Sequence, residues 1–128
     1  MVNRREAEER DACIFYFSRG IPEAFKVIFF EHYPEFFSFS MMLLQQRQEA
    51  RQVTIEAFFL LWNRRRDFDN GKRIKAFLYL ALRNKCLQRL KSEPEEKTRG
   101  SAVRMGVIPT SLPADILRDV FAFAARTH

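Results

Sequence analysis

Apolar residues recur at helical spacing along most of the chain, in segments separated by glycine, proline or polar residues. In the segment that begins at Pro22, for example, Phe25, Ile28 and Phe29 fall on one side of a helix. This spacing predicts six helices. They cover 4–19, 22 to a break at 32–34, 34 or 35 to 46, about 49–65, about 72–91, and 114–125.

The boundaries of these segments hold residues that typically end or begin helices. Gly20 ends the first, because only glycine takes the left-handed conformation of a helix terminus without steric cost, and Pro22 suits the first turn of the next. His32-Tyr33-Pro34 is predicted to break the second helix, and Asn70-Gly71 is a turn signal. The sequence leaves open whether 45–48 is a short polar break or a continuous join.

The composition indicates an all-α protein built around one domain. The chain has 128 residues, fourteen of them Phe, and its four Gly and five Pro fall mainly outside the periodic segments. A chain of this length can bury a core. We predict a compact helical bundle of about five helices over 1–91, a polar linker with three Pro and two Gly over 92–113, and a short helix within 114–128.

Cysteine usage and hydropathy favour a cytoplasmic location. Cys13 and Cys86 are too few for a secreted disulfide framework and lack the spacing of a metal site. The charged N-terminus has no signal-type apolar core, and no apolar run approaches the roughly eighteen residues of a membrane span.

Positive charge is concentrated in one stretch of the chain. Between Asn63 and Lys91 there are ten Lys or Arg against Asp67 and Asp69, a local net charge of +8 where the whole chain carries +6. Patches of this sign attract polyanions. The sequence therefore points to a nucleic acid as one partner.

Three segments together resemble the second conserved region of the sigma-70 superfamily, in particular the small extracytoplasmic-function sigma factors of bacteria. Arg19-Gly20, Glu23-Ala24-Phe25 and His32-Tyr33-Pro34 look like the opening "GD-x-x-AF … YYP" of that family. Residues 50–62 look like "AEDIVQEVFLKLW", and 68–90 look like the loop and helix that end in "LYRIARNRCLDYLR". The resemblance covers about residues 10–91.

This resemblance implies two binding surfaces on one helical domain. The helix at 49–62 would dock on core RNA polymerase, and the loop and helix at 67–91 would recognise and melt the minus-ten promoter element. The expected polymerase-binding residues are Arg51, Gln52, Ile55, Glu56 and Phe59. The expected DNA-binding residues are Arg64, Arg65, Arg66, Phe68, Asn70, Lys72, Arg73, Phe77, Leu80, Arg83 and Asn84.

The chemistry of the last helix before the linker fits contact with unpaired bases. Arg73, Phe77, Leu80 and Asn84 recur at spacings that place them on one stripe. An Asn amide can donate to and accept from a base edge, and an aromatic ring gives an unstacked base a surface. A purely structural role for these residues remains open. Phe68, Phe77 and Leu80 can be core residues, Asn84 can simply be exposed, and Arg64 to Arg66 can be a solvated helix end.

The chain also departs from the family's pattern. Arg51, Gln52 and Ile55 stand where the family usually has an acidic pair and a Gln, and Leu60 and Leu80 replace residues that are commonly basic. These changes raise an alternative: a degenerate sigma-fold interaction module, bound by an anti-sigma factor or by polymerase without initiating transcription. Ile55, Leu60 and Leu80 would then form an exposed apolar patch.

The end of the chain resembles the first helix of the family's region 4, over residues 111–121, so that domain is expected to be largely absent. Nothing in the pattern indicates an enzyme. His32 and His128 support neither a catalytic triad nor a zinc site, and Asp67 and Asp69 are more simply helix-capping or ion-pairing residues. We expect no metal and no cofactor, and the sequence leaves the oligomeric state undetermined.

Overall fold

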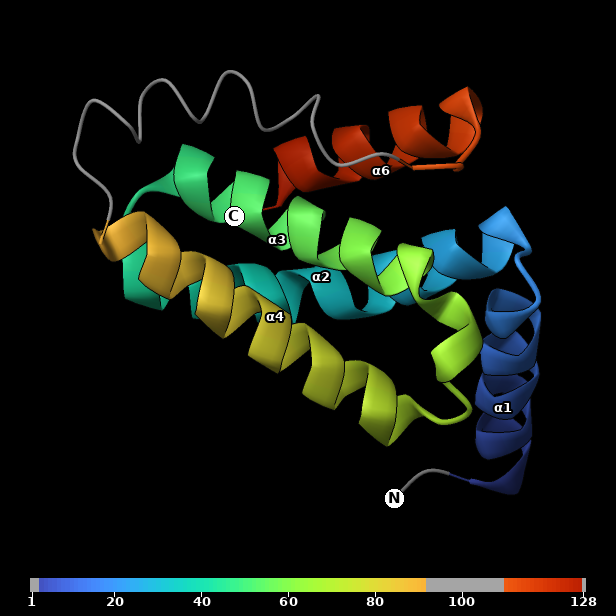
Figure 1. Cartoon of the computed structure of the whole chain (residues 1–128). Helices are drawn as coiled ribbons and strands as arrows, with labels where there is room; N and C mark the ends of the chain where they lie inside the picture. The colour runs from blue at the N-terminus through green and yellow to red at the C-terminus, as the bar shows by residue number, and fades with distance from the viewer. Residues whose placement is uncertain (1–2, 92–109, 128) are drawn as a thin grey trace.

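Five α-helices and one 3-10 turn make up most of residues 3–91 and 110–127, which are the residues that the structure, a computed structural model, describes (Figure 1). There is no strand among these residues, so the prediction of an all-α fold is confirmed. The elements are α1 (Arg4–Ser18), α2 (Pro22–Leu44), α3 (Arg47–Asn63), η1 (Arg65–Asp67), α4 (Gly71–Lys91) and α6 (Ala114–Arg126). Most of the predicted linker, 92–109, lies outside the described residues.

The predicted helix break at Pro34 is wrong, because α2 continues through it. Proline lacks the N–H that would bond to the carbonyl four residues back, which normally disrupts a helix. Here the Pro34 ring is exposed, while Tyr33, Phe36 and Phe37 around it are almost fully buried. Burial of these rings on the core side outweighs the one lost hydrogen bond. The break comes instead at Gln45, whose φ of 58° is left-handed, so 45–46 is a true interruption.

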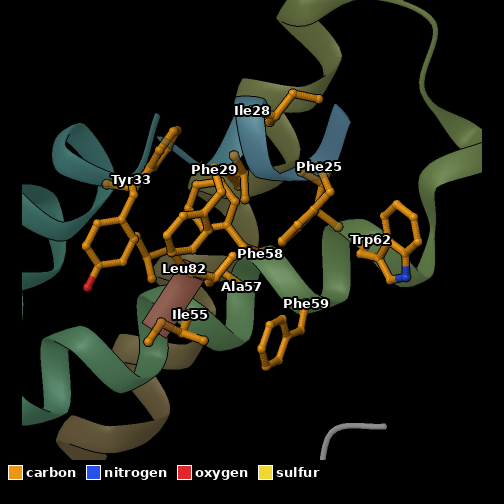
Figure 2. Close-up of a cluster of buried hydrophobic side chains, with 14 of the residues drawn as sticks. Phe25, Ile28, Phe29, Tyr33, Ile55, Ala57, Phe58, Phe59, Trp62 and Leu82 are labelled. Carbon is orange, nitrogen blue, oxygen red and sulfur yellow. The ribbon is translucent and has the colours of Figure 1, made fainter. Parts of the chain in front are cut away.

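The core lies between α2, α3 and α4 and is unusually aromatic. Figure 2 shows Phe25 and Phe29 of α2 meeting Phe58 and Trp62 of α3. The centroid of the Phe29 ring lies 4.8 Å from that of Phe58 and 5.7 Å separates the Phe25 and Trp62 rings, both pairs edge to face. Each such pair contributes about 0.5–1.5 kcal/mol beyond its buried area. These ring contacts therefore fix how α2 and α3 pack.

α1 closes one end of this core. Asn3 caps its N-terminus by accepting a hydrogen bond from the Glu6 backbone N–H at 2.8 Å, and Phe17 packs against Trp62 near its C-terminus. The chain then turns at Gly20, whose φ of 87° favours glycine. A Cβ added there would also lie 3.3 Å from Nε of Arg65. Gly20 thus lets α1 pack closely against the η1 turn.

α6 lies along α2 and α3, parallel to α2 and antiparallel to α3 (Figure 1). Its buried residues repeat every four positions and form one stripe that continues from the residue before the helix. They are Leu112, Ile116, Val120 and Ala124. None of the helices within 3–91 and 110–127 is long and apolar enough to cross a membrane.

Candidate nucleic-acid interface

The loop between α3 and α4 is held in place by short-range hydrogen bonds. Asn70 caps α4, since its Oδ1 accepts from the Arg73 backbone N–H at 2.9 Å, and its Nδ2 donates to Asp69 at 3.0 Å. Phe68 points inward and is only 8% exposed. Asn70, predicted to contact DNA, therefore already serves as a helix cap, although its side chain remains exposed.

The predicted stripe on α4 faces outward. Arg73 and Asn84 are exposed, Leu80 is 59% exposed, and Phe77 is half-buried. The centroid of the Phe77 ring lies 5.3 Å from that of Phe68, edge to face, so Phe68 supports Phe77 from inside. Lys72 and Arg83 are also exposed. The interpretation of Asn84 and Leu80 as surface residues is consistent with this geometry, whereas Phe68 is a core residue.

An arginine side chain lies close to the Phe77 ring. The guanidinium of Arg64 lies 5.9 Å from the ring centroid, close enough for a cation–π contact. Arg64 also pairs with Asp67 at 3.2 Å, and Arg73 pairs with Asp69 at 3.8 Å, all with side chains more than half exposed. Exposed pairs of this kind are weak. They can exchange a carboxylate for a phosphate at little cost.

The three consecutive arginines do not share one role. Arg64 and Arg66 are exposed, but Arg65 is half-buried, with its guanidinium 4.3 Å from the Trp62 ring and its Nη1 donating to the Trp62 carbonyl at 3.1 Å. Arg65 therefore ties η1 to the core. A cavity of about 380 Å³ opens between these side chains and is lined by Asn63, Arg64, Arg65, Arg66 and Asp67.

The residues predicted to bind polymerase lie inside the bundle. Ile55, Phe59, Glu56 and Gln52 are 2–6% exposed, and Arg51 is half-buried. Phe59 packs edge to face against Phe121 of α6, with 6.1 Å between centroids. As folded, these α3 side chains offer almost no surface to a partner.

Glu56 is held by α4 and by its own helix. Its carboxylate accepts from Nζ of Lys85 at 2.9 Å and from Nε2 of Gln52 at 3.2 Å, and it lies 4.0 Å from Nη2 of Arg89, which is 1% exposed. Glu49 also reaches Arg89, at 3.7 Å. No sequence pattern indicates this ion cluster, because residues of opposite charge 29 or more positions apart carry no local signal.

A second cavity, of about 690 Å³, lies between α1, α2 and the start of α4. Its lining includes Cys13, whose pKa burial raises, and His32, whose pKa burial lowers below the usual 6.5. Within the described part of the chain, no three His, Cys, Asp or Glu side chains are grouped to hold a metal ion.

Comparison with known proteins gave one match. The model of the sigma-70 region 2 family matches residues 28–94, which run from the first third of α2 to just past α4 and include the loop and stripe described above. Neither a curated protein nor a solved structure shows significant similarity to the chain.

Proposed function

Because the chain belongs to the sigma-70 region 2 family, whose domains in general bind RNA polymerase and help melt promoters, we propose that it is a transcription initiation protein of the extracytoplasmic-function type. It binds core RNA polymerase through α3 and the minus-ten promoter element through the η1 loop and α4. It acts in the bacterial cytoplasm, where both partners are found. It is not an enzyme.

One observation carries the DNA half of this proposal: a cation, an aromatic ring and an amide follow one another on the same outward face. Arg64 lies 5.9 Å from the Phe77 ring, and Asn84 follows Phe77 two turns along α4. Stacking, phosphate binding and base-edge recognition are the three contacts that single-stranded DNA offers.

Melting a promoter requires that bases leave the duplex, which costs a few kcal/mol for each unstacked step. Stacking of an unpaired base on an aromatic ring offsets about 1–3 kcal/mol of that cost. Phe77, backed by the buried Phe68, is a rigid surface for one such base. Arg64, Arg66 and Arg73 hold phosphates without reading sequence, and the Asn84 amide reads a base edge.

Binding to single-stranded DNA tests this assignment directly. Fluorescence anisotropy with a randomised single-stranded pool, and then with the oligonucleotides selected from it, measures the affinity. Phe77→Ala and Asn84→Ala are each expected to weaken binding roughly fivefold to a hundredfold. Phe39→Ala on α2 is the matched control, since Phe39 is also half-buried and packs edge to face on an α4 ring, that of Tyr79. Parent-like affinity of both α4 variants would show that the base-reading assignment is wrong.

The alternative, an interaction module with an exposed apolar patch, finds less support. Ile55 is 2% exposed and Leu60 is half-buried, so only Leu80 of the three predicted patch residues is clearly on the surface. The patch that would receive a partner does not form in this fold. Co-purification with core polymerase followed by run-off transcription separates the two functions, because retention without transcription would select the interaction module.

A further inference from the structure

The helix α6 packs mainly on α2 and also covers the part of α3 that carries Phe59, one of the expected polymerase contacts. Phe59 of α3 packs on Phe121 of α6, and Trp62, one turn further along α3, donates from Nε1 to the hydroxyl of Ser111 at 3.0 Å. α6 runs antiparallel to α3, so the residues after Phe121 lie toward the half of α3 that holds Ile55 (Figure 1). Ile55 and Phe59 share one stripe of α3, four residues apart.

The side chains at this contact are complementary. The buried stripe of α6 is apolar, and the Phe121 ring next to it meets Phe59 of α3, which shares a stripe with the apolar Ile55. Beside it, the Phe123 ring stacks on Phe30 of α2, with 4.6 Å between centroids, and Nζ of Lys26 pairs with Asp119 at 3.1 Å.

α6 lies outside the segment of the family match, although its Phe123 ring packs on Phe29 and Tyr33 of α2. The family match covers residues 28–94 and so contains α3 and α4 but not α6. The largest buried rings, among them Phe25, Phe29, Phe58 and Trp62, join α2 to α3 directly. These contacts between α2 and α3 do not involve α6, so they remain when α6 moves away.

We propose that α6 is a displaceable cover over the polymerase-docking face of α3, so that the enzyme and α6 compete for Ile55 and Phe59. This inference rests on the proposed function. When only a fraction of molecules is open, the apparent affinity for a partner falls by that fraction. A substitution that weakens the packing of α6 on α3 therefore strengthens polymerase binding, whereas a cross-link that holds α6 in place weakens it. The DNA-binding stripe on α4 is unaffected, because α6 packs on α2 and α3.

Two full-length variants test the cover in opposite directions. Phe121→Ala removes the ring that meets Phe59 and is expected to tighten binding to purified core polymerase roughly tenfold. Phe15→Ala, which deletes a ring that is 52% exposed on α1, is the control and leaves that affinity unchanged. For the lock, Lys26→Cys and Asp119→Cys are joined by a short bis-maleimide in a Cys13→Ser background, since Cys86 is buried. The joined protein is expected to lose at least tenfold in polymerase affinity compared with its unjoined form and to keep its affinity for single-stranded DNA.

Hydrogen exchange provides a readout that does not involve polymerase. Phe121→Ala is expected to speed amide exchange in α6 while the amides of α2 and α4 keep their protection. Loss of protection throughout the bundle would show that α6 is part of the core and overturn the proposal, as would equal polymerase binding by joined and unjoined protein. If hydrogen exchange shows that α6 opens and yet no variant binds polymerase, the proposal that this chain binds polymerase is wrong. The docking role of the α3 face is then wrong as well.

Discussion

The buried carboxylate of Glu56 allows a quantitative test of how α3 and α4 are joined. Its side chain is 4% exposed and lies 2.9 Å from Nζ of Lys85 and 4.0 Å from Nη2 of Arg89. Glu56→Gln keeps the size of the side chain and much of its hydrogen bonding but removes the charge. Lys85 and Arg89 of α4 then face α3 without the negative charge that they share.

The expected cost follows from the burial of these groups. Breaking a buried ion pair on one side costs about 3–5 kcal/mol, because a charge is left in a poorly solvated place. Lys85 is 20% exposed, and Arg89 keeps Glu49 at 3.7 Å, so both retain some solvation or pairing. We therefore expect a loss near the lower end, about 3 kcal/mol in the free energy of unfolding. For a domain of this size that corresponds to a fall of roughly 10–15 °C in Tm.

Urea and thermal unfolding followed by circular dichroism measure this loss. Glu8→Gln is the control, because the Arg4–Glu8 pair is just as short, at 3.1 Å, but its side chains are 93% and 67% exposed. The control is expected to cost less than about 0.5 kcal/mol. If Glu56→Gln costs no more than the control, Glu56 does not hold α4 to α3, and its burial needs another explanation.

Three further predictions address α2, His32 and the arginines. Pro34→Ala restores a backbone hydrogen bond within α2 and is expected to raise the free energy of unfolding by about 1–3 kcal/mol in urea denaturation; an unchanged value would mean that the proline costs the helix nothing. Burial lowers the pKa of His32 below 6.5, so the unfolded chain takes up a proton first. The contribution of neutral, buried His32 to stability is thus fully present above about pH 6.5 and is lost as the pH falls toward the folded-state pKa. His32→Gln is expected to lose less stability than the parent protein between about pH 7.5 and 5.5. An equal loss in the two proteins would contradict this reasoning. Arg64→Gln with Arg66→Gln is expected to reduce the slope of log affinity for single-stranded DNA against log salt by about 0.7 for each lost phosphate contact, while Arg4→Gln on α1 leaves the slope as it is.

Apart from the break predicted at Pro34, the helices and their approximate ends followed from the sequence, and so did the family. Helical spacing of apolar residues is a local property, and so are the glycine, proline and polar residues that end most of these segments. The outward stripe of Arg73, Phe77 and Asn84 was predictable for the same reason, since positions on one helix keep fixed angles to one another.

Which faces of the helices are covered depends on contacts between segments that are far apart in the chain. Pro34 stays within α2 because the surrounding rings are buried by distant helices, and local propensity does not include that energy. Glu56, taken from the pattern as a surface contact, turns inward because Lys85 and Arg89 of another helix meet it there. Phe59 packs against Phe121 of α6, a helix that follows it by more than fifty residues. Such contacts depend on how helices assemble, and a one-dimensional pattern records no distance between segments that are far apart in the chain.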